Sequence, residues 1–257
     1  MPCRLLTRTL THLVKPLSAG LLVAFLLLLG VASLVWNLIA AVIYPFISDE
    51  RGRAIGRAVI AYSYRAAWAV ATALGMLRLD STVLDRFRDE PGLIIVANHP
   101  SMLDALILVA RLPHSACIMK AGLMKNIFLG SGARLARYIR NDSARSMVRL
   151  AVEDLKNGGQ LVVFPEGTRT TREPVDPFRP GVTLIAKLAG APVQTVFIDT
   201  DSPYLRKGWP LWKLPPFPIT FAIREGARFA ASPDSDQLLH ELEQYFAAGV
   251  KRTGAPG

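Results

Sequence analysis

The sequence predicts an α/β fold, in which helices flank a mostly parallel sheet, preceded by an N-terminal membrane-associated helical hairpin. Two observations support this prediction. Residues 16–48 contain no charged side chain, although the 257-residue chain has 30 Lys and Arg and 20 Asp and Glu. After residue 80, short apolar runs alternate with helical periodicities, which is typical of parallel sheets covered by helices. We therefore expect membrane-anchoring helices at residues 1–79 and one globular domain at residues 80–257.

The first element is an apolar helix from Ala19 to Ile43. At about 1.5 Å per residue, a helix of this length exceeds the roughly 30 Å hydrocarbon thickness of a bilayer. A signal peptide would have a shorter apolar core of about 7–15 residues and then a small-residue cleavage site, which does not follow here. The segment is therefore expected to enter the membrane.

The second element runs from Ala58 to Leu77, framed by Arg57 and Arg78 and interrupted by Arg65. An arginine near the end of a segment can extend to the head groups, so its insertion costs less than at the bilayer centre. Two arrangements stay open. The segment is either the second helix of a hairpin or an amphipathic helix lying along the interface.

Basic residues indicate how these elements are oriented. Arg4, Arg8 and Lys15 should stay cytoplasmic, and a single span would then place the globular domain outside. A cytoplasmic globular domain needs a hairpin, a re-entrant helix or an exception to the charge rule. Arginines 51, 53 and 57 in the expected connecting loop disfavour two full spans, so we favour a shallow or re-entrant hairpin.

The globular part is expected to alternate buried strands with amphipathic helices. The clearest helix follows Asp142 or Ser143, either of which can cap it, and Gly158 can end it. A late strand and a closing helix complete the pattern. The expected strands are 93–97, 115–120, 137–140, 161–164, 192–198 and 219–224, and the other expected helices are 101–111, 182–189 and 238–250.

The heptad NHPSMLD at residues 98–104 leaves the end of a predicted buried strand. A histidine there can act as a general base at neutral pH, and a carboxylate on its other ring nitrogen would fix the tautomer. Asp104 lies about one helical turn after His99, which allows such a pair. Ser101 and Asp104 also match a capping box, so a purely structural role for the carboxylate stays open.

The hexapeptide FPEGTR at residues 164–169 also leaves an apolar strand. Gly167 permits a tight turn, Thr168 offers a hydroxyl group, and Arg169 supplies a planar fork suited to phosphate or carboxylate. The alternative is a polar turn with a surface arginine. Chemistry in parallel sheets gathers where strands end, so the two motifs support each other.

At this spacing the two motifs resemble those of the lysophosphatidic acid acyltransferase (1-acylglycerol-3-phosphate O-acyltransferase) family, over residues 92–224. The resemblance implies a glycerolipid acyltransferase fold and direct attack of a lysolipid hydroxyl on an acyl thioester. In that reaction His99 would deprotonate the hydroxyl and Asp104 would orient His99. The implied substrate-binding residues are Glu166, Gly167, Thr168, Arg169, Lys120, Arg140 and Asn141.

One stretch departs from the family pattern. An aromatic-Ile/Val-Asp-Arg string usually supplies an arginine for the phosphate, and this chain has Tyr138-Ile-Arg-Asn141 instead. The arginine is either displaced to Arg140 or replaced by Asn141, which would lose a charge-assisted contact of about 1.5–3 kcal/mol. The departure favours bacterial members that acylate specialised lipids, of the ornithine lipid or aryl polyene type, as an alternative acceptor class.

The expected partners are a lysolipid acceptor, acyl-CoA or acyl carrier protein as donor, and an anionic membrane surface, which suits the net charge of +10. We expect the protein to lie in the inner (cytoplasmic) membrane, with the catalytic domain on the cytoplasmic side.

No cofactor or metal is expected, since CxxC and HExxH spacings are absent. A serine hydrolase is disfavoured, because the sequence contains no G-x-S-x-G motif. Aromatic residues do not alternate with basic ones, so no nucleic acid is expected. A non-catalytic lipid or carrier-binding module remains an alternative.

The stretch from residue 203 to 218 combines five prolines, two tryptophans and three basic residues. Two interpretations stay open. It is either an interfacial loop that dips aromatic side chains into the head-group layer, or a rigid connector that packs Trp209 and Trp212 on its own domain.

Overall fold

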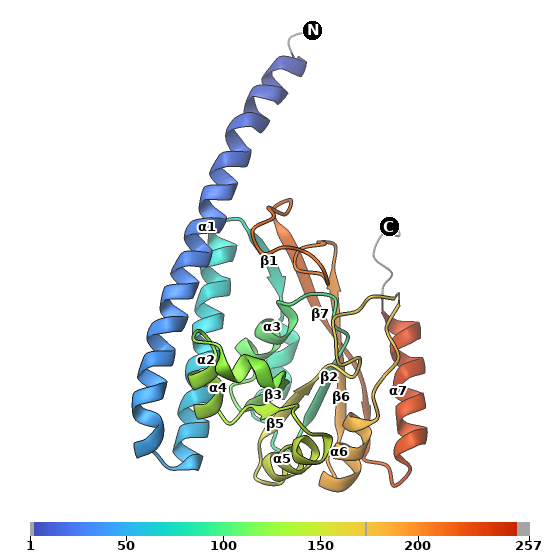
Figure 1. Ribbon diagram of the computed structural model, residues 1–257. Helices are drawn as coiled ribbons and strands as arrows, with labels where there is room; N and C mark the ends of the chain where they lie inside the picture. Colours follow the sequence, from blue (N-terminus) through green and yellow to red (C-terminus); the bar gives the residue numbers. More distant parts are fainter. Residues whose placement is uncertain (1–2, 173, 251–257) are drawn as a thin grey trace.

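The computed structural model describes the backbone of residues 3–172 and 174–250, and within these ranges the side chains from residue 18 onward. A seven-stranded sheet with the order β1-β7-β6-β2-β5-β3-β4 forms the centre, and helices cover both of its faces (Figure 1). All neighbouring strands pair in parallel except β6 and β7, which are antiparallel. The predicted mostly parallel α/β fold is confirmed.

The strands follow the predicted ranges closely, with two differences. They are β1 (Leu77–Asp80), β2 (Ile94–Ala97), β3 (Ser115–Met119), β4 (Ile139–Arg140), β5 (Gln160–Val163), β6 (Val193–Thr200) and β7 (Ile219–Phe229). Strand β1 was not predicted, because four residues of the sequence LRLD alternate too briefly to stand out from the end of the preceding helix. Strand β7 runs five residues beyond the predicted strand, along the edge of β6.

The helices are α1 (Cys3–Ile43), α2 (Asp49–Ala73), α3 (Asp104–Arg111), α4 (Gly130–Leu135), α5 (Ala144–Lys156), α6 (Gly181–Ala189) and α7 (Ser235–Gly249). Short 3-10 helices lie at η1 (Tyr44–Phe46), η2 (Thr82–Phe87) and η3 (Ala121–Lys125). The side chain of Ser143 caps α5, as predicted, and Gly190 ends α6 in the left-handed conformation. The predicted helix at 101–111 begins only at Asp104, since the preceding residues form the turn that carries the NHPSMLD motif.

Two hydrophobic cores sandwich the sheet. On one face, side chains of α2 and α3 pack with those of alternate strand residues such as Ile95 and Ala97. On the other face, α5, α6 and α7 pack with the intervening residues, such as Ile94 and Val96. Since successive strand residues point to opposite faces, a strand buried on both sides is apolar throughout, which is why β2 reads as a continuous hydrophobic run.

Helix α1 is the one helix among the described residues that is long and apolar enough to cross a membrane. The segment Ser18–Phe46, which continues from α1 through η1, reaches a mean hydropathy of 2.5, and only 6% of its most apolar window is buried. The helix extends past the rest of the molecule at its N-terminal end (Figure 1). The basic residues 4, 8 and 15, on which the predicted orientation depends, have side chains outside the described part of the chain.

Two polar side chains in the C-terminal quarter of α1 fasten it to the start of α4 and the residues before it. Ser33 Oγ and Asn37 Nδ2 both donate to the carbonyl of Phe128, and Asn37 Oδ1 accepts from the backbone N–H of Gly132. A Cβ atom at Gly132 would lie 2.6 Å from Nε1 of Trp36, so this close approach requires glycine. Helix α1 is therefore fastened to the globular part through its C-terminal quarter.

Helix α2 packs on the globular part rather than standing apart as a second apolar span. It lies beside α1 in a hairpin (Figure 1) and contacts α3 and α4. The prediction that arginines 51, 53 and 57 occupy a connecting loop is wrong, because α2 already begins at Asp49. Ser48 caps this helix and acidic residues occupy its first turn, a start signal that favours helix over loop.

Arg57 of α2 is buried, with 3% of its surface exposed. It donates to the carbonyl groups of Ala136 and His114, and its Nη2 lies 2.8 Å from Oδ1 of Asp154 in α5. Arg53 pairs with the same carboxylate oxygen at 3.1 Å. The boundary that we expect at residue 79 falls inside β1, which pairs with β7, so the two parts share one sheet. The division at that residue stays a prediction.

Candidate active site

The predicted site residues follow the carboxyl ends of four neighbouring strands. In the order β2, β5, β3 and β4, these strands are all parallel, so their carboxyl ends lie at one edge of the sheet. His99 follows β2, the FPEGTR hexapeptide follows β5, Lys120 follows β3, and Arg140 and Asn141 end β4. Parallel pairing thus brings together residues that are up to 70 positions apart.

His99 and Asp104 form a hydrogen-bonded pair. Nδ1 of His99 lies 2.9 Å from Oδ2 of Asp104, whose side chain is completely buried, while the histidine stays partly exposed. The ring of Phe164 stacks on the imidazole, with centroids 4.0 Å apart and planes at 20°. Because Nδ1 is engaged by a carboxylate, the tautomer with its proton on Nδ1 leaves Nε2 free to accept a proton.

Asp104 serves the turn and the histidine at once. Its Oδ2 also accepts the backbone N–H of Ser101 at 2.7 Å, the reciprocal contact of a capping box. The two interpretations of this carboxylate are therefore compatible. Burial raises the pKa of Asp104, while the hydrogen bonds from His99 and Ser101 and the positive charge of Arg169 act in the opposite direction. No described side chain or backbone group bonds its Oδ1.

Glu166 lies beneath the site as a connecting group. Its side chain is buried and accepts the backbone N–H groups of His99 at 3.0 Å and Asp176 at 2.9 Å, and the hydroxyl of Thr170 at 2.8 Å. Burial raises the pKa of Glu166, and these hydrogen bonds partly offset that effect. The carboxylate thus ties the two motifs together from within, and its placement suits positioning better than direct contact with an acceptor.

Gly167 forms the turn that the hexapeptide predicts. Its φ is +69°, and a Cβ atom there would lie 2.6 Å from Nε of Arg179, so both the conformation and the space require glycine. Arg179 precedes α6 and donates its backbone N–H to the carbonyl of Pro165. Thr168 is partly exposed at the same turn. Arg179 is a second cationic side chain at the hexapeptide that the sequence patterns did not single out.

Arg169 connects the hexapeptide to the loop after β6. Its Nη1 donates to the carbonyl of Leu205 at 2.9 Å and to that of Arg206 at 3.2 Å. One guanidinium nitrogen is therefore committed to main-chain acceptors. The predicted role of Arg169 on an anionic head group would fall to its other nitrogens and stays a proposal.

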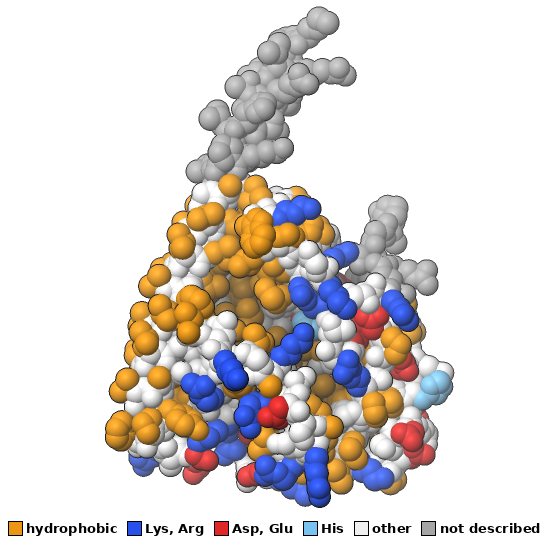
Figure 2. Space-filling view, viewed as in Figure 1, with side chains coloured by type: hydrophobic (Ala, Val, Ile, Leu, Met, Phe, Trp, Pro, Cys, Tyr) orange, Lys and Arg blue, Asp and Glu red, His pale blue; other side chains and the backbone are white. Residues whose placement is uncertain are grey.

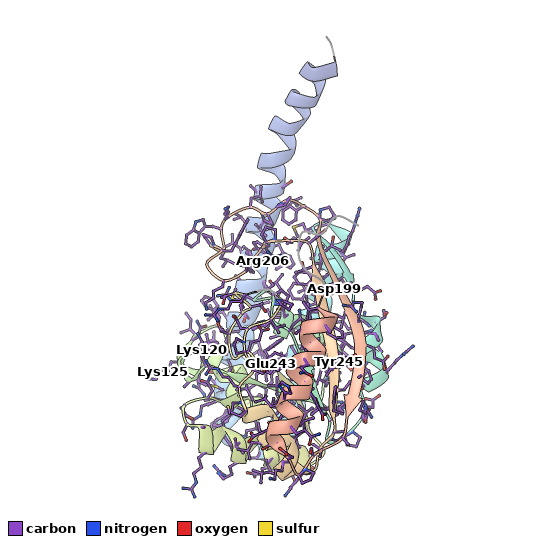
Figure 3. The ribbon with its side chains drawn as sticks, turned by 90° about the vertical axis from the view of Figure 1, so that its right-hand side faces the viewer. Lys120, Lys125, Asp199, Arg206, Glu243 and Tyr245 are labelled. Carbon is purple, nitrogen blue, oxygen red and sulfur yellow. The ribbon has the colours of Figure 1, made fainter. Side chains whose placement is uncertain are left out.

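Lys120, Arg140 and Asn141 are exposed at the ends of β3 and β4. Arg140 makes a loose ion pair with Asp142, with 3.5 Å between Nη2 and Oδ2. Lys120 and Lys125 both project on the same side of the molecule, below the loop that carries Arg206 (Figure 3). On the face in Figure 2, Lys and Arg side chains line the lower rim of a hollow whose upper part is mainly hydrophobic.

Two supporting residues were given no role by the sequence patterns. Phe164 was assigned to the end of an apolar strand, yet it covers the imidazole ring. Asn98 is buried and bonds both main-chain groups of Ile198, accepting its N–H at 2.8 Å and donating to its carbonyl at 2.9 Å. It thereby extends the pairing of β2 with β6 one step beyond the strand. The signal in the sequence that could have identified Asn98 was a polar residue directly after a fully buried strand.

The described residues contain no group of three or more His, Cys, Asp or Glu side chains that could hold a metal ion.

A model of the family described as Acyltransferase matches residues 78–199, a range that includes both motifs and the strands that carry them. This part of the chain, just under half of its 257 residues, therefore resembles the acyltransferase family. The resemblance to its lysophosphatidic acid acyltransferases is confirmed by the relatives described next. A Pseudomonas aeruginosa protein named 1-acyl-sn-glycerol-3-phosphate acyltransferase is 27% identical over 241 residues, which cover 91% of this chain and 90% of the relative.

Two Caenorhabditis elegans proteins, named putative 1-acyl-sn-glycerol-3-phosphate acyltransferases, are also similar to this chain. They are 29% and 25% identical over 123 and 112 residues, or 45% and 41% of the chain and 44% and 43% of the relatives. Among solved structures, the 1-acyl-sn-glycerophosphate acyltransferase PlsC from Thermotoga maritima superposes with a TM-score of 0.65 at 20% identity. That match covers 94% of this chain and all of the other, and it shows that the fold is shared.

Proposed function

We propose that this acyltransferase moves a fatty acyl group from a thioester to a hydroxyl group of a lysolipid, with His99 as general base. The observation that carries the proposal is the pair formed by His99 and the buried Asp104, beside the hexapeptide at one sheet edge. A histidine held by a carboxylate through Nδ1 presents Nε2 as a base. The family supplies the reaction class, and this pair supplies a group to perform it.

The chemistry proceeds by direct transfer. Nε2 of His99 takes the proton from the acceptor hydroxyl as its oxygen attacks the thioester carbonyl, and the carbon–sulfur bond then breaks. The imidazolium returns the proton to the leaving thiolate, which departs as a thiol. The carboxylate of Asp104 stabilises the imidazolium that exists between the two proton transfers, and Phe164 keeps the ring in place.

A 1-acylglycerol-3-phosphate acceptor is the first candidate, because the relatives are named for that substrate. Exposed Lys120 and Arg140 and the free nitrogens of Arg169 offer cations for a phosphate at the same sheet edge. The donor would be acyl-CoA or acyl carrier protein, and the acidic carrier suits the charge of +10.

A lysolipid without the glycerophosphate head group is the second candidate acceptor. It is favoured by Asn141, which is exposed at the end of β4 where the family pattern has an arginine. The neighbouring Arg140 is already engaged with Asp142, although loosely. Ornithine-lipid or aryl polyene precursors are the acceptors of this class to test.

We further propose that the enzyme is bound to the inner membrane through α1, with the sheet edge on the cytoplasmic side. The exposed apolar surface of α1 supports attachment. The hairpin supports a cytoplasmic domain, because α2 returns the chain to the side from which α1 started.

The reaction is tested with purified full-length protein in mixed micelles, two thioester donors and a panel of lysolipids. We expect His99→Ala to lower kcat/KM by about 10³-fold. His240→Ala provides the matched control, because His240 is an exposed histidine of α7 far from the site. Wild-type protein that is folded but transfers no acyl group from either donor to any acceptor would favour the non-catalytic binding module.

A further inference from the structure

The segment from residue 203 to 213, which we call the lip, is fastened to the NHPSMLD motif. The hydroxyl of Ser101 donates to the carbonyl of Tyr204 at 3.0 Å, and the backbone N–H of Met102 donates to the carbonyl of Leu205 at 3.1 Å. Tyr204 and Leu205 are buried, and Leu205 has a φ of +58°, a conformation rare for a branched side chain. The base of the lip is therefore held tightly beside the catalytic pair.

The lip is also fastened to the FPEGTR motif. Arg169 donates to the carbonyls of Leu205 and Arg206, so both signature motifs bond the same short stretch of backbone. A displacement of the lip would therefore also shift the two turns that carry His99 and Gly167.

The two tryptophans of the lip have opposite environments. Trp209 faces inward: it packs at the edge of the core, its Nε1 donates to the carbonyl of Lys213 at 3.1 Å, and the Lys213 ammonium lies 4.2 Å from its ring centroid. Trp212 faces outward with 84% of its surface exposed, next to Leu211 at 43%. Trp209 therefore packs on its own domain, as a rigid connector requires, whereas Trp212 is exposed, as an interfacial loop requires.

The exposed tip is surrounded by positive charge. Arg206, Lys207 and Lys213 belong to the lip, and residues 202–218 contain no acidic residue. An exposed tryptophan beside cations is the combination found where proteins meet the head-group layer of a membrane, since the indole ring partitions to that interface and the cations meet anionic lipids.

We propose that Leu211 and Trp212 insert into the interfacial layer of an anionic bilayer, as a second membrane contact separate from α1. Charge and composition favour lipid as the occupant of this surface over a second copy of the chain, which would bring equal positive charge to the tip. The hydrophobic surface of α1 continues across the hollow toward this end of the molecule (Figure 2). The lip thereby sets the height of the His99 site above the lipid.

This inference rests on the membrane attachment proposed above, but not on acyl transfer. Its test uses full-length protein in vesicles of phosphatidylethanolamine and phosphatidylglycerol, with a Cys3→Ser background and a fluorescent NBD label on Trp212→Cys. The remaining Cys117 is buried, and burial raises the pKa of its thiol to about 12, so it does not compete for the label. Leu188→Cys provides the control, because Leu188 is 49% exposed near the end of α6 at the opposite sheet edge.

Flotation with the vesicles first establishes attachment, and its failure would reject the membrane proposal itself. In floated protein we expect nitroxide lipids to quench the label at position 212 by about half or more, and the label at 188 hardly at all. Equal quenching at the two positions would overturn the inference. A second copy or a carrier protein covering the tip would protect the label from iodide without bringing it within reach of nitroxide lipid, and that result would overturn it too.

A kinetic comparison tests what the insertion does. We expect Trp212→Ala to lower kcat/KM about tenfold for an acceptor embedded in vesicles, and less than twofold for a short-chain acceptor dissolved in water. Leu188→Ala should change neither value. Equal losses with both acceptors would show that Trp212 acts on the folded site rather than through the bilayer.

Discussion

The guanidinium group of Arg57 in α2 and the carboxylate of Asp154 in α5 form a buried ion pair, 2.8 Å apart, that joins helices on opposite faces of the sheet. Arg57 also bonds two main-chain carbonyls, so its charge is well compensated. The pair fixes α2, and with it the hairpin, against the globular part of the molecule.

Removal of one partner of this ion pair should therefore lower the free energy of unfolding. Arg57→Ala leaves the carboxylate of Asp154 with only the partly exposed Arg53, and we expect the free energy of unfolding to fall by about 3–5 kcal/mol. Denaturant unfolding in detergent measures this. Arg51→Ala, an exposed arginine of the same helix, should change little. Replacing both partners, as Arg57→Met with Asp154→Leu, should recover part of the loss. An Arg57→Ala protein as stable as Arg51→Ala would contradict the buried pair.

Phe164 should contribute to the rate through its contact with the imidazole. Phe164→Leu keeps an apolar side chain but removes the stacked ring, so we expect kcat to fall about 3- to 10-fold, in line with roughly 0.5–1.5 kcal/mol for an aromatic pair. The thermal midpoint should change by only a few degrees. Phe229→Leu is the control, since Phe229 packs edge-on against Tyr245 away from the site. An unchanged kcat for Phe164→Leu would show that the hydrogen bond to Asp104 alone positions the ring.

The buried carboxylate of Asp104 should make stability depend on pH. Its pKa is raised in the folded state, so between the unfolded value of about 3.9 and the folded value the native protein binds more protons than the unfolded chain. The stability from this group is complete below the unfolded pKa and is lost as pH rises through the folded pKa. The stability of wild type relative to Asp104→Asn should therefore decrease as pH rises from about 4. Thermal unfolding of both proteins across pH measures the difference, in which the contribution of Glu166 cancels. A difference that grows with pH would contradict the assignment.

Alanine substitutions at two glycines with similar backbone conformations can distinguish the cost of backbone strain from the cost of a steric clash. Gly167 and Gly190 have φ values of +69° and +64°, but only Gly167 has a side chain, that of Arg179, within reach of an added Cβ. Gly190→Ala should cost about 1 kcal/mol of stability and leave kcat/KM unchanged. Gly167→Ala should cost more and also lower kcat/KM, because Arg179 and the turn must move. Equal effects of the two substitutions on activity would show that the turn tolerates the shift.

The proximity of the NHPSMLD and FPEGTR motifs was predictable because it follows from the sheet. His99 and the hexapeptide each end a buried strand, and parallel pairing of β2 with β5 places both at one edge. The direction of β7 was not predictable, since alternating apolar residues look the same in parallel and antiparallel strands. Its antiparallel pairing with β6 depends on the long connection that contains the lip.

The position of α2 could not be deduced from its own residues. An arginine at the start of an apolar segment indicates a membrane boundary unless buried partners exist, and the partners of Arg57 lie 57 to 97 positions away. The same limit applies to Arg169. Its contact with the lip depends on the unusual backbone of Leu205, which no local pattern in the sequence indicates.

The bonds from Ser33 and Asn37 to the segment before α4 have a consequence for how the protein responds to different lipids. A free apolar helix adapts to a thicker or thinner bilayer by tilting on its own. Helix α1 is held near the middle of the apolar segment Ser18–Phe46, so a tilt would turn α4 and the sheet edge with it. With α1 inserted as proposed above, acyl-chain length in the surrounding membrane becomes a variable that acts on the orientation of the whole molecule, and not only on its anchor.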